Sequence, residues 1–149
     1  MIKVLFICHG NICRSTMAES LFTHMVKEAG REEEFLIASA GTSREEIGNP
    51  PHRGTVKKLK EMGVPVVPHR AVQMTAKDVE EYDYLIGMDR CNLRNMERIA
   101  DGKKEKLRTL LSFAGSEEDI ADPWYTGDFD RTYEDIQKGL QAFLKTIEE

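Results

Sequence analysis

The sequence predicts a three-layer α/β fold in which helices flank an open sheet of about four parallel strands. Short apolar runs alternate along the chain with longer segments whose apolar residues recur at helical spacing. The first run, Ile2 to Ile7, is apolar except for Lys3, as expected of a strand covered on both faces. Strands that alternate with helices pair in parallel, and such sheets bind ligands at the carboxyl ends of their strands. We therefore expect a binding site where the first strand ends.

The first half of the chain continues this pattern. From Thr16 to Ala29 apolar residues recur every three or four positions, which predicts a helix that Gly30 ends. Phe35 to Ala40 is predicted to form a second strand that ends in a turn. A loop with several Gly and Pro residues covers 44–54, and residues 52–62 are predicted to form a basic amphipathic helix.

The second half contains shorter elements. Residues 64–67 are predicted to form a marginal edge strand, because Pro65 cannot donate a hydrogen bond within a sheet. Segment 107–113 mixes strand and loop signals, and both interpretations stay open. The remaining patterns predict, in order, a short helix around Val79, a strand at 84–88, a helix at 89–99 and a last helix at about 130–147.

Length, charge and cysteine content limit the class of protein. A length of 149 residues suits one core, so we expect residues 1–149 to form a single domain. The net charge of −5 argues against general binding to nucleic acid, which requires a basic surface. The apolar runs are too short for a membrane span or a signal peptide, so we expect a cytoplasmic protein that does not bind membranes. Three cysteines then indicate reduced thiols rather than a disulfide framework.

The segment from Cys8 to Ser15, called the Cys8–Ser15 loop below, connects the first strand to the first helix. Backbone N–H groups in such a loop and the positive end of the following helix dipole form a seat for a phosphate-like anion. Arg14 follows Cys8 by six positions, so its planar guanidinium can reach the rim of the loop and hold two oxygens of a tetrahedral anion. The thiol then lies at the floor of the seat.

The polar residues of this loop fit nucleophilic chemistry. The guanidinium, the helix N-terminus and the loop amides all favour a Cys8 thiolate over the thiol. Ser15 can donate its hydroxyl to that thiolate and later to the departing sulfur. Asn11 tolerates a left-handed backbone and can hold the loop through side-chain hydrogen bonds, and Gly10 gives the loop room to turn. The alternative is that Cys8 is an ordinary buried cysteine near a surface arginine, without a role in catalysis.

The Cys8–Ser15 loop, Cys-His-Gly-Asn-Ile-Cys-Arg-Ser, resembles the signature loop of the low-molecular-weight protein tyrosine phosphatases. The resemblance extends in the family's order over nearly the whole chain, through Ser39–Ser43, Gly48–Pro51, Pro68–Arg70, Asp83–Tyr84, Met88–Asp89, Asn92–Leu93 and Asp122–Tyr125. It implies a flavodoxin-like sheet. It also implies that Ser39 and His69 support Asn11. Finally, it implies that the phosphate is surrounded by the loop residues His9, Gly10, Asn11, Ile12, Cys13 and Ser15.

Asp122 is the candidate general acid, because a thiolate that displaces a phenoxide from phosphorus needs a group that protonates the leaving oxygen. Pro123 favours an extended Asp122 on a loop, although an Asp-Pro pair more often only starts a turn. The family assigns this role to the matching aspartate. Trp124 and Tyr125 could line an aryl-sized slot together with Ile12. The same carboxylate would later take a proton from the attacking water, which implies a bell-shaped pH profile with an acidic optimum.

The resemblance therefore implies hydrolysis of phosphotyrosine in proteins, or of small aryl phosphates, through a phosphocysteine that releases inorganic phosphate. Loop amides and Arg14 match the three equatorial oxygens of the transition state, so no metal or other cofactor is required. Cys8, His9 and Cys13 could suggest a zinc site, yet four ligands at ordinary spacings are absent from the sequence. In the family, the cysteine that matches Cys13 can pair with the nucleophile on oxidation; packing of the loop by a small buried residue is the alternative.

Two departures from the family pattern bear on the site. Thr16 stands where the family usually has Pro, and Thr is an acceptable helix cap. Glu45 stands where many members have an aromatic wall, so one side of the slot is predicted to be missing and negatively charged. Both changes leave Trp124 and Tyr125 in place.

Three alternatives remain open. Protein arginine phosphatases resemble the same loop but have Thr where this chain has Ile12, whose apolar side chain favours an aryl ring. Thioredoxin-coupled arsenate reductase also resembles the loop, but it needs two further cysteines as a relay, and Cys91 alone is available outside the loop. A phosphate- or phosphoprotein-binding module without catalysis is the third.

Overall fold

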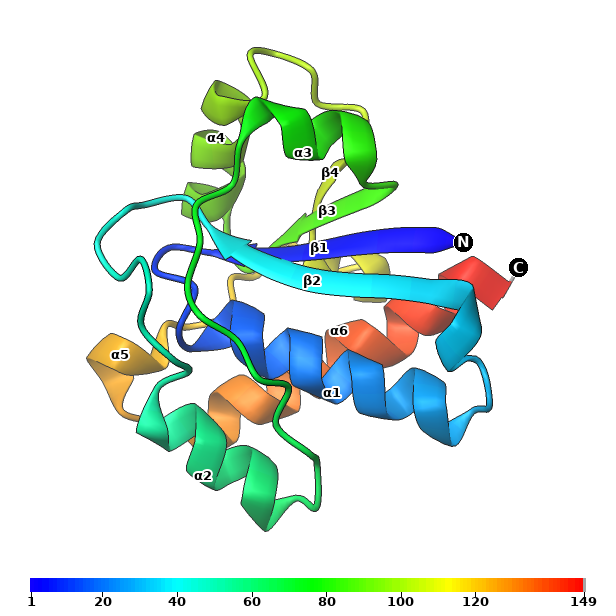
Figure 1. The fold of residues 1–149 in the computed structure, drawn as a ribbon, viewed down its shortest axis with the longest axis vertical. Helices are drawn as coiled ribbons and strands as arrows, with labels where there is room; N and C mark the ends of the chain where they lie inside the picture. Colours follow the sequence, from blue (N-terminus) through cyan, green and yellow to red (C-terminus); the bar gives the residue numbers. More distant parts are fainter. Residues whose placement is uncertain (149) are drawn as a thin grey trace.

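The computed structural model describes residues 1–148, and it has four parallel strands in one sheet (Figure 1). The strands are β1 (Ile2–Cys8), β2 (Phe35–Gly41), β3 (Tyr84–Gly87) and β4 (Leu107–Thr109). Their order in space is β2-β1-β3-β4, and every neighbouring pair is parallel. Because β1 lies inside the sheet with partners on both sides, its carboxyl end lies at the middle of one edge. The predicted three-layer α/β fold is confirmed.

Helices cover both faces of the sheet (Figure 1). On one side lie α1 (Arg14–Glu28), α2 (Arg53–Glu61), α5 (Pro123–Thr126) and α6 (Phe129–Glu148), and on the other lie α3 (Ala76–Glu81) and α4 (Arg90–Ile99). Successive residues of β1 point to opposite faces. Val4 and Phe6 therefore join the core beneath α1 and α6, whereas Leu5 and Ile7 join the core beneath α3 and α4. This double burial explains the continuous apolar run of β1.

Side-chain caps begin several of the helices. Asp89 accepts a hydrogen bond from Asn92 N at the start of α4, and Asp122 accepts one from Trp124 N at the start of α5. His52 caps α2 by accepting from Gly54 N, and Thr75 caps α3 through a capping box. Each cap satisfies an N–H group that has no partner within its helix. Asp89 and Asp122 are thereby held at the edge of the sheet where β1 ends.

Two sequence predictions need correction and one is resolved. Residues 64–67 form no strand; instead the segment runs as coil against α1, where Val67 N donates to Ser20 Oγ at 3.0 Å. Pro65 lacks an N–H group, and this bond gives Val67 N–H a partner outside any sheet. Segment 107–113 begins with a strand, as one of its two signals indicated, but β4 is followed directly by the 3₁₀ helix η2 (Leu110–Ala114) and not by a loop. Helix α1 begins at Arg14, two residues before the predicted start, so Thr16 is not its cap.

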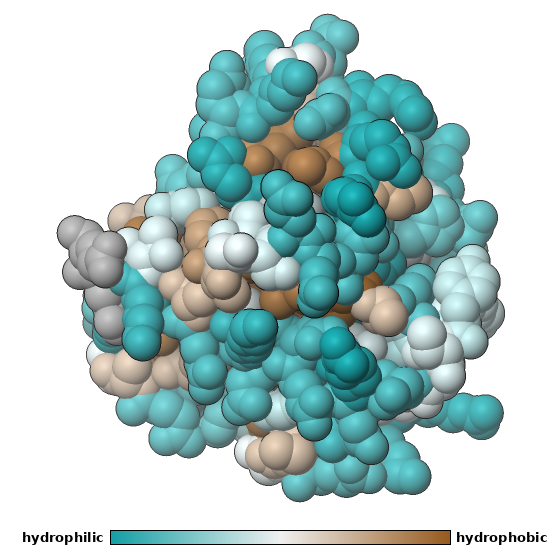
Figure 2. All heavy atoms as spheres, turned by 180° about the vertical axis from the view of Figure 1, so that it is seen from behind, coloured by the Kyte–Doolittle hydropathy of each residue, from teal (hydrophilic) through white to brown (hydrophobic). Residues whose placement is uncertain are grey.

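One face of the molecule is predominantly polar. Figure 2 shows hydrophilic residues over most of the face opposite to the view in Figure 1, with apolar atoms visible mainly in hollows between them. Within residues 1–148, no helix has both the length and the apolar character needed to cross a membrane.

Candidate active site

The Cys8–Ser15 loop places Cys8 at the carboxyl end of β1, immediately before the N-terminus of α1. Cys8 is 3% exposed, and its Sγ atom lies 3.0 Å from Ser15 Oγ. Asn11 adopts a φ angle of 61°, the left-handed conformation that the sequence analysis expected. The loop thus turns sharply around the sulfur and presents the hydroxyl of Ser15 to it.

Asn11 connects the loop to two other parts of the chain. Its side-chain nitrogen donates to Ser15 Oγ at 2.8 Å and to Ser39 Oγ at 3.0 Å. Its Oδ1 accepts from Val72 N at 3.0 Å and lies 2.6 Å from His69 Nε2, a contact that requires the proton on Nε2. Asn11 is fully buried, and all of these bonds constrain the loop. The structure therefore brings Ser39 and His69 together at Asn11.

Glu19 is a part of this network that the sequence analysis missed. Ser39 Oγ donates to Glu19 Oε1 at 2.5 Å, and His69 Nδ1 lies 3.7 Å from the same oxygen. Burial raises the pKa of Glu19, although the hydrogen bond from Ser39 opposes this shift, and burial lowers the pKa of His69. Both shifts favour uncharged forms, which suits a buried network beside an anion site.

Arg14 is almost completely buried at the opposite side of the loop. Its Nη1 atom donates to Asp89 Oδ2 at 2.7 Å and to the carbonyl oxygen of Ile120 at 2.9 Å. Burial by itself lowers the pKa of Arg14, but the charge of Cys8 and the charges and hydrogen bonds of the nearby carboxylates outweigh it, so that the pKa is raised. Asp89 is a second residue that the sequence analysis did not assign to the site.

The Nε atom of Arg14 is buried and has no hydrogen-bond partner among the described residues. An unpaired buried N–H group of a charged side chain costs free energy, so such groups are rare and need an explanation. The other side of the guanidinium is already held by Asp89 and Ile120. The free Nε–H therefore marks a place for an acceptor from outside residues 1–148.

Asp122 lies at the same guanidinium, although 108 residues separate it from Arg14 along the chain. Its Oδ2 atom accepts a bond of 3.4 Å from Arg14 Nη2, while Oδ1 accepts from Trp124 N. The side chain of Asp122 is 23% exposed, so the carboxyl group faces both the site and the solvent. The structure therefore brings the three candidate catalytic residues, Cys8, Arg14 and Asp122, to one place.

A small cleft of about 90 Å³ opens beside Asp122. This space is called the cleft below, and it is lined by His9, Gly10, Ile12, Glu45, Glu46, Asp122, Trp124 and Tyr125. All four residues predicted for the substrate slot thus lie in one cleft, and Glu46 is an addition that the sequence did not reveal. Glu45 Oε2 lies 3.0 Å from His9 Nε2, and both side chains are largely exposed. The lining therefore combines apolar and aromatic side chains with the carboxylates of Glu45 and Glu46.

Comparison with known proteins assigns the family. A family model described as low molecular weight phosphotyrosine protein phosphatase matches residues 3–149. The chain belongs to this family. Low molecular weight protein-tyrosine-phosphatase YfkJ of Bacillus subtilis is 36% identical over 151 residues, which cover 99% of this chain and 97% of that protein. The crystal structure of YfkJ matches with a TM-score of 0.95 and 37% identity over 99% of this chain and 95% of that chain.

Two further proteins are similar to this chain in sequence or in structure. The low molecular weight phosphotyrosine protein phosphatase of Saccharomyces cerevisiae is 39% identical over 152 residues, covering 97% of this chain and 94% of that protein. The crystal structure of the drosophila arginine phosphatase matches with a TM-score of 0.90 and 29% identity, covering 99% of both chains. This chain is therefore a phosphatase of the low molecular weight family, and its structural neighbours include an arginine phosphatase.

Cys13 and Thr16 occupy the inner side of the phosphatase loop. Cys13 is buried, and burial, with the charge of Cys8, raises its pKa to about 12, so it is held as a neutral thiol. Thr16 lies in the first turn of α1 and donates to the carbonyl oxygens of Ile12 and Cys13 at 2.9 and 3.0 Å. Thr16 thus fastens the end of the loop from inside the helix.

Proposed function

We propose that this phosphatase hydrolyses phosphotyrosine in proteins and small aryl phosphates through a phosphocysteine on Cys8. The observation that carries the proposal is the arrangement of the Arg14 guanidinium. Its Nε–H is buried and unpaired, its charge acts on Cys8, and its Nη2 contacts Asp122. A phosphoryl group bound by Nε and the loop amides would lie above the sulfur and within reach of Asp122. The domain that carries out this reaction comprises residues 1–149.

In the first step, the thiolate of Cys8 attacks phosphorus and the bond from phosphorus to the phenolic oxygen breaks. Asp122 donates its proton to that oxygen, so a neutral tyrosine leaves. The guanidinium of Arg14 and the loop amides hold the equatorial oxygens and stabilise their charge. Because these donors are fixed by Asp89, Asn11 and Ser39 before substrate binds, they need no reorganisation during the reaction.

In the second step, water attacks the phosphocysteine. Asp122, now ionised, takes a proton from this water, and the sulfur–phosphorus bond breaks to release inorganic phosphate. Ser15 Oγ lies 3.0 Å from the sulfur and can donate its hydroxyl to the departing thiolate. The hydroxyl in turn accepts from Asn11 Nδ2, which leaves its own proton free to point at the sulfur.

Phosphoarginine is the second candidate substrate, and Glu45 is the observation that favours it. Glu45 lines the cleft, where its carboxylate would attract the guanidinium of phosphoarginine. Ile12, which lines the same cleft, favours an aryl ring instead. Parallel measurement of kcat/KM for phosphotyrosine and phosphoarginine peptides decides between the two. The arsenate reductase alternative receives no such support, because Cys91 is the one cysteine of this sequence outside the loop.

Hydrolysis of an aryl phosphate by the wild type, Cys8→Ser and Cys91→Ser tests the proposal. We expect Cys8→Ser to lose at least about 10⁴-fold in kcat, because an alcohol in place of the thiolate is a poor nucleophile. Cys91 is exposed on α4, so Cys91→Ser is the matched control and should retain the wild-type rate. Rapid quenching should trap phosphate on Cys8 in the wild type. A Cys8→Ser variant with a rate close to that of the wild type would reject the phosphocysteine mechanism, and a wild type that binds phosphate without turnover would indicate a binding module.

A further inference from the structure

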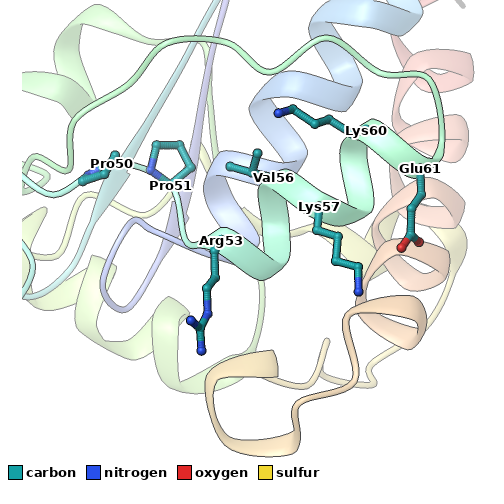
Figure 3. Close-up of a pocket in the computed structure, with 7 residues that line it drawn as sticks. All are labelled: Pro50, Pro51, Arg53, Val56, Lys57, Lys60 and Glu61. Atoms are coloured by element: carbon teal, nitrogen blue, oxygen red, sulfur yellow. The ribbon is translucent and has the colours of Figure 1, made fainter.

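A second and larger hollow lies along α2 (Figure 3). This hollow, called the α2 groove below, has a volume of about 830 Å³. It is lined by Pro50, Pro51, Arg53, Val56, Lys57, Lys60 and Glu61. Arg53, Lys57 and Glu61 extend downward from α2 in Figure 3, whereas Val56 and Lys60 extend to the left, the side on which Pro50 and Pro51 lie. The groove therefore combines apolar surface from two prolines and a valine with long charged side chains at its borders.

The charge of the α2 groove is opposite to that of the whole protein. Arg53, Lys57 and Lys60 are exposed, and their side chains form no ion pair or hydrogen bond within residues 1–148. Glu61 is the one anion of the lining, and it already lies 3.7 Å from Lys58. Three unpaired cations on one helix of a chain whose net charge is −5 attract an anionic partner and repel a cationic one.

The α2 groove begins beside the cleft of the active site. His52, directly before α2, donates its backbone N–H to the carbonyl oxygen of Ile12 at 2.7 Å. The ring of His52 lies edge-on to Trp124, with centroids 5.6 Å apart, and stacks on Phe129 at 5.4 Å. Gly54 approaches Phe129 so closely that a Cβ atom at this position would overlap the ring. The start of α2 is thus packed against the Cys8–Ser15 loop and against Trp124 of the cleft.

We propose that the α2 groove binds an acidic segment of the phosphoprotein substrate while its phosphorylated residue occupies the cleft. This inference rests on the proposed function. From Arg53 to Lys60 the helix rises by about 10 Å, which an extended peptide covers with about three residues. Acidic residues that contact α2 would therefore occupy about three to four consecutive positions of the peptide, and we place this span roughly three to six positions from the phosphorylated residue. An apolar side chain between them would contact Val56 and Pro51.

The cleft has the reverse preference at short range. Glu45 and Glu46 line it, so an acidic residue directly next to the phosphorylated one meets two carboxylates. Like charges at this distance disfavour binding. The two surfaces together therefore select substrates by the position of negative charge, and not by its amount alone.

Peptide binding provides the test. We would measure fluorescence anisotropy with labelled peptides that carry a phosphonate analogue of phosphotyrosine, so that binding is observed without turnover. One pair of peptides has Glu or Gln three to six positions before the analogue, and a second pair has them after it. For one of the two pairs we expect the Glu peptide to bind about five- to tenfold more tightly than the Gln peptide, and 0.5 M salt should remove most of this preference. Equal affinities within both pairs would overturn the proposal.

Matched variants assign the preference to the α2 groove. The triple variant Arg53→Ala/Lys57→Ala/Lys60→Ala should bind the Glu and Gln peptides with similar affinity. Lys103, Lys104 and Lys145 are also exposed, so the control Lys103→Ala/Lys104→Ala/Lys145→Ala makes the same change to the net charge and should keep the wild-type preference. An equal loss of preference in both variants would assign it to overall charge and overturn the proposal.

Two other results separate this inference from its alternatives. A protein that prefers the Glu peptide but hydrolyses no aryl phosphate would reject the proposed function and keep the α2 groove as a docking surface for acidic segments. Binding to phosphatidylserine vesicles that the triple variant loses, without any preference between the peptides, would instead assign the surface to membranes and overturn the proposal.

Discussion

The floor and the rim of the active site are built in different ways. On the floor, Cys8, Asn11 and Arg14 are buried, and side chains from distant parts of the sequence hold the loop in place. On the rim, the side chain of Glu45 is mostly exposed and, within residues 1–148, is held only by His9, while Tyr125 is 81% exposed. A buried group that is fixed by several hydrogen bonds is preorganised for a transition state, whereas exposed groups on loops can change their conformation and their residue type more freely. In the proposed mechanism, the floor therefore determines the reaction, and the rim influences which substrates react.

Arg14→Lys provides the strongest test of the floor. Lysine supplies one ammonium group, so it cannot hold Asp89 and Ile120 on one side and the phosphoryl group on the other. We expect kcat/KM for an aryl phosphate to fall by about 10³-fold. Arg108→Lys, at β4 on the surface, is the control, and thermal unfolding shows whether both variants fold. A loss of less than about tenfold in a folded Arg14→Lys would mean that a single charge is sufficient there.

Asp122→Asn tests the point where floor and rim meet. Asparagine can still accept a hydrogen bond from Trp124 N, so the cap of α5 remains while the acid is lost. We expect kcat for phosphotyrosine to fall by about 10²-fold or more, because tyrosine is a poor leaving group without a proton.

Leaving-group dependence distinguishes lost acid catalysis from structural damage in Asp122→Asn. The defect in kcat/KM, which reports the first step alone, should be smaller for p-nitrophenyl phosphate, whose phenolate leaves readily, and the alkaline limb of the pH profile of kcat/KM for phosphotyrosine should disappear. Equal defects in kcat/KM with both substrates would remove Asp122 from its role as the acid.

The floor could largely be predicted from sequence because most of it is local. Cys8, Asn11, Arg14 and Ser15 lie within eight residues, between a strand and a helix. A segment this short has few possible conformations, so residue types and spacing were sufficient to predict which side chains lie together. Asp122 lies far away along the chain, and its preceding segment shows no regular pattern. Its place beside Arg14 follows from tertiary packing, which the family resemblance supplied and the local pattern could not.

Glu19 and Asp89 were missed although weak signals for both were present. Glu19 follows Ser15 by four residues, so the two share one face of α1. Asp89 comes directly after β3, and therefore lies at the same edge of the sheet as Cys8. The incorrect strand at 64–67 has the opposite cause, because the local apolar pattern was present but no strand lay beside it to pair with.

Cys13 offers a test of the floor under oxidation. Peroxide converts the Cys8 thiolate to a sulfenic acid, and attack by Cys13 would then form a disulfide and release water. Burial and the charge of Cys8 hold the pKa of Cys13 at about 12, and the second cause disappears once Cys8 is oxidised. Because the thiolate is the attacking form, disulfide formation should accelerate as the pH rises from 7 to 9.

Mass spectrometry after mild peroxide should find the Cys8–Cys13 disulfide in the wild type and in the control Cys91→Ser. In Cys13→Ser we expect Cys8 sulfinic acid instead, with a several-fold smaller recovery of activity on reduction. Wild-type protein that contains only Cys8 sulfinic acid would show that Cys13 packs the loop and has no redox role.

Glu45→Gln is the mildest change and probes the rim alone. The carboxylate repels the phosphate dianion of an approaching substrate, but its exposure screens this effect. We expect KM for a phosphotyrosine peptide to fall about two- to threefold at low salt with kcat unchanged, and KM for a phosphoarginine peptide to rise. Glu33→Gln, on the exposed 3₁₀ helix η1 (Glu32–Glu34), provides the control. A changed kcat would mean that Glu45 acts on the chemistry of the floor, and the separation between floor and rim would then fail.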